Sequence, residues 1–278
     1  FCLEKLVVEG FPILAVVTAP DRKAGRGKKM NASAVKVYSE EQNLPLLQPE
    51  NLKDPSFVAA LKNLAPEIQV VVAFRMLPKV VWQVPKLGTI NLHASLLPNY
   101  RGAAPINWAI MNGEKESGVT TFFIEKEIDT GKVLFQEKVT IEPNDNAGTL
   151  HDKLMVVGGE LVVKTLKAIV EDDYSETSQE LMFTEESELK PAHKIFKQDC
   201  EINFNQTATN VHNLIRGLSP YPGAWAKFNL NSEQKTIKFF KSILTDIKVE
   251  GSKILVGENG ILIPCSDFYI SISELQAE

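Results

Sequence analysis

The sequence predicts an α/β protein, with a Rossmann-like, doubly wound and mostly parallel sheet followed by a small C-terminal β-barrel or sandwich. Two nearly unbroken apolar runs, ILAVVTA at 13–19 and IQVVVAF at 68–74, suit parallel strands that are covered on both faces. Helix-like and strand-like segments alternate along the first part of the chain, as βαβ units require. Short strand-like segments with turn signals follow near the C-terminus, which is typical of a small β-domain.

The individual elements follow from periodicity and from turn residues. After the strand 13–19 we predict, in order, a helix 33–42, a strand 44–48, a helix 55–64 that Asp54-Pro55 opens, the strand 68–74, a helix 77–84, a strand 88–95, a helix 104–112, and strands 118–126 and 132–141. A long amphipathic helix spans 146–172, and Gly158-Gly159 is expected to break or bend it. Beyond it we predict a helix 207–218 and strands within 224–228, 235–244, 253–257, 260–265 and 269–275.

A change in composition divides the chain. Residues 171–190 hold eight acidic residues and one lysine, with few aliphatic side chains, and Pro191 follows. This composition is typical of a linker. The predicted domains are therefore a first domain at 1–174, an acidic linker at 175–191 and a β-domain at 192–278.

Composition also bears on the class of protein. No window approaches 18 unbroken apolar residues, so we expect no membrane span. The three cysteines lack CxxC spacing and the four histidines lack metal-ligand spacing, so no metal is expected. A reducing, cytoplasmic setting follows. The opening FCLEKLVVEG is typical of the interior of an amphipathic helix, so further residues are expected before Phe1 and the lack of a targeting signal carries little weight.

The charge is unevenly distributed. The chain carries a net charge of −5, yet DRKAGRGKKM at 21–30 sets five basic residues against one acidic residue. A concentrated basic loop on an acidic protein is a candidate contact for a phosphate-rich partner. A solvated, mobile surface loop is the alternative, and these ten residues taken alone favour it.

Polar side chains gather at the end of the strand 88–95. Asn91 and His93 stand two residues apart, so they point to the same face of an extended strand. Ligands bind outside the carboxyl ends of such strands, and Asp129, which Gly131 follows closely, could set the tautomer of the imidazole there. A structural hydrogen-bonded pair is the alternative. Ser95 lies on the same face but lacks a GxSxG elbow, so a structural hydroxyl is favoured over a serine hydrolase.

NLHASLLPNYRGAAPI at 91–106, followed by EIDTGKVL at 127–134, resembles the folate-dependent formyltransferase family. Within that family, PDRKAGRGKK at 20–29 and the small C-terminal β-domain are similar to the members that act on methionyl-tRNA. The resemblance covers nearly the whole chain, and the family pattern places a first strand and a Gly-Thr-Pro turn before Phe1. It implies 10-formyltetrahydrofolate as formyl donor, the α-amino group of methionyl initiator tRNA as acceptor, and an OB-like barrel at the C-terminus that binds tRNA.

The family's catalytic trio maps onto Asn91, His93 and Asp129. Formyl transfer needs no enzyme nucleophile, because the amine attacks the formyl carbon itself. The Asn91 amide can donate to the developing oxyanion, and Asp129 can orient His93. Whether His93 accepts the proton of the amine or assists the oxyanion stays open at this point.

The resemblance also implies where the donor binds. Backbone groups at 71–77 and near Ile128-Asp129 would line the pterin site, and the loop from Leu96 to Pro105 would shape the pocket. Phe74-Arg75 stands where family members often carry an aromatic-glycine step, so contacts at the pocket edge are expected to differ. The predicted folate-binding residues are Val72, Ala73, Phe74, Leu77, Ser95, Leu96, Leu97, Pro98 and Ile128.

The basic loop acquires a specific role from the resemblance, because in the family this loop enters the acceptor-stem region and helps to distinguish initiator from elongator tRNA. Arg26 matches the family's most important loop arginine. The predicted tRNA-binding residues are Arg22, Lys23, Arg26, Lys28, Lys29 and Arg101. Residues 191–278 contain nine basic and nine acidic residues, where a basic face would be usual. Lys235, Lys238 and Lys241 could still form a local basic stripe, or simply solubilise the strand surface.

The sequence leaves two alternative functions open. The same trio would serve a formyltransferase that acts on a small amine, such as an amino sugar nucleotide or glycinamide ribonucleotide, but a small acceptor has no use for the basic loop or for the β-domain. A folate- or RNA-binding module without turnover would tolerate substitution of Asn91, His93 and Asp129. A monomer is expected.

Overall fold

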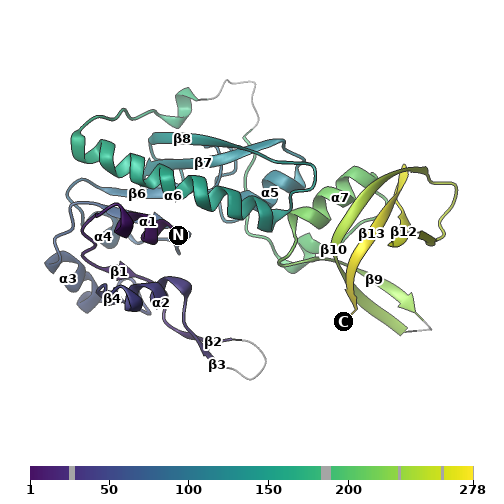
Figure 1. The fold of residues 1–278 in the computed structure, drawn as a ribbon, viewed down its shortest axis with the longest axis horizontal. Helices are drawn as coiled ribbons and strands as arrows, with labels where there is room; N and C mark the ends of the chain where they lie inside the picture. Colours follow the sequence, from purple (N-terminus) through teal and green to yellow (C-terminus); the bar gives the residue numbers. More distant parts are fainter. Residues whose placement is uncertain (25–28, 183–188, 231–232, 258–259, 278) are drawn as a thin grey trace. The chain divides into compact units, whose positions relative to one another are not determined.

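The computed structural model describes residues 1–24, 29–182, 189–230, 233–257 and 260–277 (Figure 1). The chain divides into two compact units. The first consists of Phe1–His93, Thr120–Glu137 and Met155–Met182, and the second of Ala94–Val119, Lys138–Leu154 and Phe183–Glu278. The domain boundaries inferred from composition, at 174 and 191, stay a prediction.

The first unit opens with α1 (Cys2–Val8), β1 (Val16–Val17), the antiparallel pair β2 (Arg22–Ala24) and β3 (Lys29–Asn31), α2 (Ala34–Glu41), β4 (Leu46–Leu47) and α3 (Pro55–Asn63). β1 and β4 form a short parallel pair. Both helices begin where capping residues predict. The Ser33 hydroxyl accepts the Lys36 N–H at 3.1 Å, and the Asp54 carboxylate accepts the Ser56 N–H at 2.8 Å, with Pro55 in the first turn.

A four-stranded sheet follows, in the order β5 (Gln69–Val72), β6 (Thr89–His93), β7 (Glu116–Phe123) and β8 (Val133–Thr140). Helix α4 (Lys79–Trp82) connects β5 to β6, and these two strands are parallel as predicted. β6 and β7 are antiparallel, so the α/β sheet is mixed. The segment between β7 and β8, residues 124–132, contains no helix and carries Asp129.

Helix α6 (Ala147–Glu171) lies along one face of this sheet (Figure 1). Its buried residues Val162, Leu166 and Ile169 pack with Ile90 of β6 and with further apolar side chains of the first unit. The structure has one helix here instead of the two that a break at Gly158-Gly159 would give. A Cβ on Gly159 would lie 2.9 Å from ring atoms of Phe1, so this glycine allows α1 to pack closely.

The second unit contains α5 (Pro105–Met111), α7 (Ala208–Gly217) and a five-stranded antiparallel sheet. The sheet has the order β11 (Leu255–Gly257), β12 (Gly260–Pro264), β13 (Phe268–Ala277), β10 (Glu233–Lys248) and β9 (Ala224–Leu230). Short 3₁₀ helices span Gln179–Leu181 in the first unit and Lys197–Cys200 in the second. The expected small C-terminal β-domain is thus confirmed.

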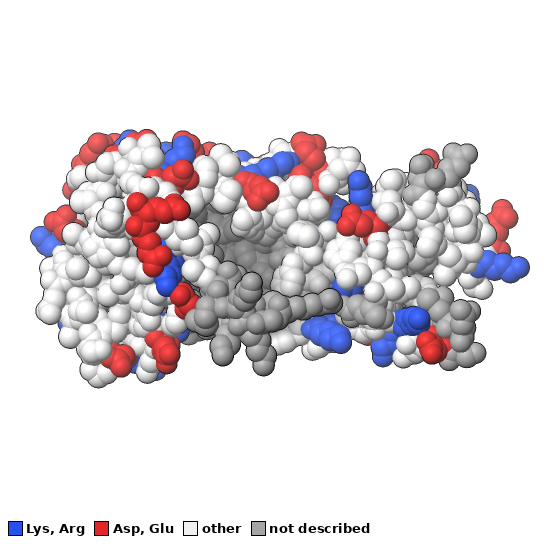
Figure 2. All heavy atoms as spheres, turned by 60° about the horizontal axis from the view of Figure 1, so that its bottom comes forward, with Lys and Arg blue, Asp and Glu red and all other residues white. Residues whose placement is uncertain are grey.

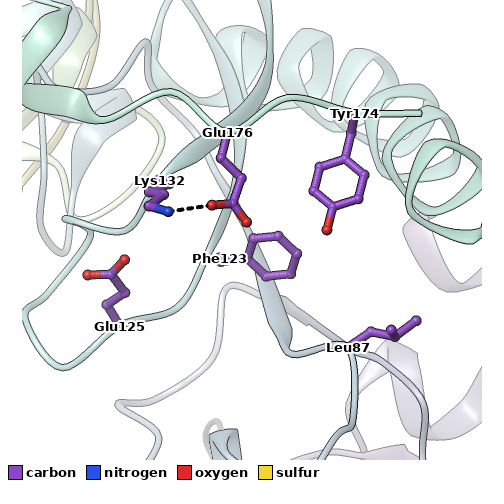
Figure 3. A pocket seen from close by; sticks show the side chains of 6 residues that line it. All are labelled: Leu87, Phe123, Glu125, Lys132, Tyr174 and Glu176. Atoms are coloured by element: carbon purple, nitrogen blue, oxygen red, sulfur yellow. Dashed lines mark hydrogen bonds and ion pairs between the residues drawn. The ribbon is translucent and has the colours of Figure 1, made fainter. Parts of the chain in front are cut away.

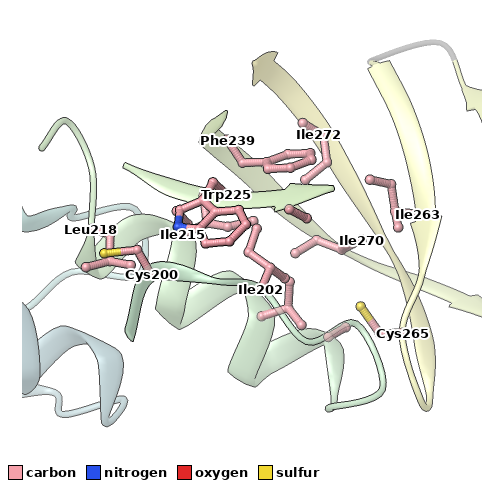
Figure 4. Close-up of a cluster of buried hydrophobic side chains, with 14 residues drawn as sticks. Cys200, Ile202, Ile215, Leu218, Trp225, Phe239, Ile263, Cys265, Ile270 and Ile272 are labelled. Carbon is pink, nitrogen blue, oxygen red and sulfur yellow. The ribbon is translucent and has the colours of Figure 1, made fainter. Parts of the chain in front are cut away.

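The core of the second unit lies between α7 and this sheet (Figure 4). Ile215 of α7 and Phe239 and Ile270 of the sheet are at most 1% exposed. The Trp225 indole N–H donates to the Lys197 carbonyl at 3.0 Å, so its polar edge is satisfied inside an apolar cluster. Among the helices that the structure describes, none combines the length and the apolar character of a membrane-spanning segment.

Candidate active site

The three predicted catalytic residues all lie in the first unit. Asn91 and His93 lie on β6, and His93 is its last residue and 7% exposed. Asp129 comes from the β7–β8 connection, and its Oδ2 lies 3.8 Å from Nδ1 of His93. This distance is that of an ion pair and longer than an N–H···O hydrogen bond. One carboxylate oxygen therefore faces the Nδ1 edge of the imidazole, as the sequence analysis required.

The turn that carries Asp129 has a constrained backbone. Asp129 adopts φ 55, in the left-handed region that aspartate tolerates better than most residues. A Cβ on Gly131 would lie 1.7 Å from the Phe123 carbonyl oxygen, so only glycine fits where the chain passes this carbonyl. The backbone of the turn is thus constrained at Asp129 and at Gly131, which lie on either side of Thr130.

Gly131→Ala is expected to lower the free energy of unfolding by about 1–3 kcal/mol, because the added methyl group meets backbone that must move. Chemical denaturation followed by circular dichroism measures the change. Gly251→Ala is the matched control, since its Cβ would meet nothing within 4 Å. An unchanged denaturation midpoint for Gly131→Ala would show that the turn relaxes freely.

Five of the predicted folate-binding residues lie in the first unit. Val72 ends β5, Ala73 follows it at φ 47, and Ile128 precedes Asp129 and is 58% exposed. Phe74 and Leu77 pack against the buried cluster formed by Leu52, Phe57, Leu61 and Val81. The side chains of Phe74 and Leu77 are therefore used for packing, and a ligand would meet their backbone.

Arg75, where a glycine was expected from the family pattern, has a structural explanation. Its guanidinium donates to the Glu50 carbonyl at 2.8 Å and to the Pro49 carbonyl. It also lies over the Phe74 ring, 5.7 Å from the centroid, in a cation–π arrangement. The arginine thus ties the segment after β5 to residues 49–50 instead of extending freely over the strand end.

The other four predicted folate-binding residues lie in the second unit, in the loop after β6. Ser95 is fully buried, and its hydroxyl donates to the Asn99 carbonyl at 2.7 Å. This contact agrees with a structural hydroxyl. The side chains of Leu97 and Pro98 are also buried, whereas Leu96 is partly exposed. The loop can present backbone groups and Leu96 to a ligand, while its other side chains hold its shape.

Residues 190–192 hold the rest of this loop in place. The Tyr100 N–H donates to the Lys190 carbonyl at 2.6 Å, and the Ala192 N–H donates to the carbonyl of Arg101 at 2.8 Å. Gly102 lies at φ 127, and a Cβ on it would lie 2.3 Å from the Ala192 carbonyl oxygen. The backbone pairing of Gly102 with Ala192 thus adds to the rigidity that the prolines give this loop.

A buried polar group supports the same loop. The Tyr100 hydroxyl donates to Oε1 of Glu114 at 2.5 Å, and the Lys190 ammonium donates to the same oxygen at 2.6 Å. Burial and the neighbouring carboxylate raise the pKa of Tyr100. Although burial acts to raise it, Lys190 and Tyr100 together lower the pKa of Glu114. The carboxylate is therefore held ionised as an acceptor for both donors.

The predicted tRNA-binding residues fall in different places. Arg22 and Lys23 lie on β2 and Lys29 on β3, whereas Arg26 and Lys28 lie outside the described residues. On the face in Figure 2, basic and acidic side chains are interspersed in small groups among uncharged residues. Contact of these residues with a nucleic acid stays a prediction.

The three lysines of the possible basic stripe on β10 do not all share one face of the strand. Lys235 and Lys238 are three residues apart on a regular part of the strand, so their side chains point to opposite faces. Lys235 also lies 3.7 Å from the Glu233 carboxylate. Alternation along the strand separates Lys235 from Lys238, whereas Lys238 and Lys241 pair with Gln276 and Glu274, two residues apart on β13, because the register shifts between Phe239 and Lys241.

Two surface hollows lie in the first unit. One, of about 270 Å³, is lined by Leu87, Phe123, Glu125, Lys132, Tyr174 and Glu176 (Figure 3). The other, of about 680 Å³, lies between the end of α3 and α4 and is lined by Lys62, Ala65, Pro66, Glu67, Val80, Gln83, Val84 and Lys86. Neither is lined by the trio. Within the described ranges, no group of three His, Cys, Asp or Glu side chains is placed to share a metal ion.

Three further polar residues, which are not among the predicted site residues, lie near His93 and Asp129 or contact residues that do. Thr120 pairs opposite His93 across β6 and β7, and its buried hydroxyl accepts from the Gln136 amide at 2.9 Å. Gln179 donates to the backbone of the Asp129 turn. The threonines in GVTTFF could have been found, because polar residues are unexpected in a buried strand. No comparable local signal marks Gln179.

Comparisons with known proteins show which family the chain resembles. Residues 4–166 match the family described as formyl transferase, and residues 194–278 match the formyl transferase C-terminal domain. A methionyl-tRNA formyltransferase from Bacteroides thetaiotaomicron is 50% identical over 278 residues, which are 99% of this chain and 86% of that protein. A methionyl-tRNA formyltransferase from Flavobacterium johnsoniae is 48% identical over 276 residues, with the same coverage of both proteins.

A solved structure shows the same fold. The N-formyltransferase from Helicobacter canadensis, in complex with folinic acid and dTDP-3-aminofucose, gives a TM-score of 0.70 at 23% identity. The match covers 99% of this chain and 94% of that one. At this identity the likeness concerns the fold alone. Since the family profiles cover both the N-terminal and the C-terminal parts of the chain, and relatives about half identical span nearly all of it, the chain belongs to the formyltransferase family.

Proposed function

We propose that the protein transfers the formyl group of 10-formyltetrahydrofolate to the α-amino group of methionyl initiator tRNA. The observation that carries this proposal is the approach of Nδ1 of His93 to Oδ2 of Asp129, at 3.8 Å, at the end of the strand that also carries Asn91. Relatives named methionyl-tRNA formyltransferase, at 48–50% identity over 99% of the chain, support this acceptor.

The reaction balances without an enzyme nucleophile. The amine nitrogen attacks the formyl carbon, a new C–N bond forms, and the carbonyl oxygen becomes an oxyanion. The bond between that carbon and N10 of the folate then breaks, the carbonyl re-forms, and N10 takes a proton as the amine loses one. The protein must therefore stabilise one oxyanion and move one proton.

The trio is suited to both tasks. The Asn91 amide can donate to the oxyanion, and such a donor contributes about 10²–10³ in rate. Because Asp129 faces Nδ1 of His93, Nε2 is the ring nitrogen that we assign to proton transfer from the amine. The negative charge of Asp129 would favour the tautomer with a proton on Nδ1 and would stabilise the imidazolium that forms.

The donor site is proposed to involve the two groups of residues named above. Val72 and Ile128 expose apolar side chains, at 40% and 58%, next to the strand end and to Asp129 respectively. Exposed apolar surface of this kind suits a flat pterin ring. Ala73, Phe74 and Leu77 would contribute backbone, as would Ser95, Leu96, Leu97 and Pro98.

The acceptor is proposed to bind through Arg22, Lys23, Arg26, Lys28, Lys29 and Arg101. The basic composition of residues 21–30 in an acidic chain supports this assignment. We also propose the division into a catalytic domain at 1–174, a linker at 175–191 and a tRNA-binding domain at 192–278, and a cytoplasmic monomer as the active form.

Arg26→Ala is expected to raise the KM for methionyl-tRNA and to flatten its dependence on salt, because about one phosphate contact would be lost. The slope of log(kcat/KM) against log[KCl] measures this change and should fall by about one unit. Lys53→Ala, which removes a cation from an exposed position outside the basic loop, is the control. An unchanged slope for Arg26→Ala would remove this residue from the interface.

The function itself is tested by offering the purified protein 10-formyltetrahydrofolate with alternative acceptors. Methionyl initiator tRNA should be formylated, whereas an amino sugar nucleotide and glycinamide ribonucleotide should not. Preferential formylation of either small amine would replace the proposed acceptor while leaving the formyl chemistry in place. No transfer to any acceptor would leave a folate- or RNA-binding module.

A further inference from the structure

The start of the predicted acidic linker is built into the first unit. Thr177 pairs with Val133 of β8, and each N–H donates to the other's carbonyl at 2.9 Å. The Tyr174 ring lies 6.1 Å from that of Phe123, and Glu176 forms an ion pair with Lys132 at 2.6 Å (Figure 3). Residues 174–179 therefore lie along the connection between β7 and β8.

Gln179 is the innermost residue of this segment. It is 2% exposed, and its Nε2 donates to the Asp129 carbonyl at 2.9 Å and to the Gly131 carbonyl at 2.7 Å. Both hydrogens of the Gln179 side-chain amide thus donate to the same turn. A buried carbonyl that loses its donor destabilises the structure, so the two contacts hold the turn firmly in this shape.

The two carbonyls belong to the residues on either side of Thr130. Fixing both restricts the rotation of the peptide groups that follow Asp129, which already lies at an uncommon φ of 55. The direction of the Asp129 side chain depends on this backbone, and its carboxylate is only 13% exposed beside His93. A rotation of the turn would therefore move the carboxylate relative to Nδ1.

We propose that Gln179 is a positioning residue for the reaction, acting through the backbone of the Asp129 turn to hold the carboxylate against Nδ1 of His93. This inference rests on the proposed function, because it assigns Gln179 to the same trio. Gln179 is not assigned a contact with either substrate. Its effect passes entirely through the placement of Asp129.

A general structural role makes a different prediction. If Gln179 only stabilised the fold, its loss would lower the unfolding temperature and would act equally whether or not residue 129 carries a carboxylate. A positioning residue loses its effect once the group that it positions is gone. A double-mutant cycle with Asp129→Ala therefore separates the two roles.

The test uses Gln179→Met, which keeps the length of the side chain and removes both donors. We expect kcat to fall by about 10–100-fold, since a displacement on the order of 1 Å can cost about 10² in rate. The KM values for 10-formyltetrahydrofolate and methionyl-tRNA should stay within about twofold. In the Asp129→Ala background the same substitution should change kcat by less than about twofold.

Glu176→Gln is the matched control. It removes the exposed ion pair between the same segment and the same connection but leaves both contacts of Gln179 intact. Exposed ion pairs contribute little to stability, so its kcat should be that of the wild type. Thermal unfolding of each variant confirms that the assays compare folded protein. If Gln179→Met does not fold, Gln179→Glu, which has the same shape but no donor when ionised, takes its place in the cycle.

The outcomes distinguish this inference from the proposed function. An Asp129→Ala protein with wild-type kcat would overturn the catalytic trio itself. If Asp129→Ala is impaired, two results would overturn the positioning role: a wild-type kcat for Gln179→Met, or an equal loss in both backgrounds. Loss in the wild-type background alone supports it.

Discussion

His93→Ala is expected to lower kcat for formylation of methionyl-tRNA by about 10²–10⁴, the range for loss of a general base. Folate binding should change little, because the imidazole is assigned to proton transfer and is 7% exposed at the end of β6. Single-turnover formylation at saturating donor and acceptor isolates this chemical step. Donor affinity is followed separately by quenching of protein fluorescence.

His151→Ala is the matched control for this experiment. His151 also has Nδ1 close to a carboxylate, 3.1 Å from Oδ1 of Asp152, but it lies on the exposed surface of α6. An imidazole and a carboxylate at short distance are therefore not sufficient, and this variant should keep wild-type turnover. Near-normal turnover of His93→Ala would end the catalytic assignment of the trio.

Asp129→Asn should show the part that charge plays beside His93. The amide keeps the shape of the side chain and leaves the contacts of Gln179 with the backbone in place. If the carboxylate stabilises the imidazolium in the transition state, its loss and that of His93 will not be additive.

Much of the fold could be predicted because its signals are local. The apolar run at 68–74 contains the parallel strand β5, and Ser33 and Asp54 mark the starts of α2 and α3 through their side-chain caps. The long helix was predicted with a break or a bend, because two glycines weaken a helix in isolation. Packing overrides this weakness, since Gly159 leaves room for the Phe1 ring.

The candidate site could be predicted in part for the same reason. The spacing of Asn91 and His93 fixes their common face on a strand, the segment EIDTG offered Asp129 as a partner for the imidazole, and the resemblance assigned all three to catalysis. Gln179 could not be found in this way, because its importance comes from contacts with residues 48 and 50 positions away. Its surroundings in the sequence are acidic and typical of a linker, and only the fold shows that the amide is buried against a turn.

Substitution of Asn91 is the second change that is expected to lower kcat strongly. Asn91→Ala is expected to lower kcat by about 10²–10³, because it removes the proposed donor to the oxyanion. KM should change little, since the donor is assigned to charge that develops only in the transition state. Asn91→Asp has nearly the same shape but replaces the donor with a negative charge, so its kcat should be lower still.

The informative result is which of the two variants, Asn91→Ala or Asn91→Asp, has the lower kcat. A residue that only packs beside Phe122, its partner on β7, would tolerate aspartate better than alanine, because the isosteric side chain leaves no cavity. An oxyanion donor gives the reverse order, since a carboxylate repels the charge that the amide stabilises. Asn99→Asp is the control, because the Asn99 Oδ1 accepts the Lys190 N–H and a carboxylate preserves that contact. If Asn91→Asp turns over faster than Asn91→Ala, the oxyanion must be stabilised by another group.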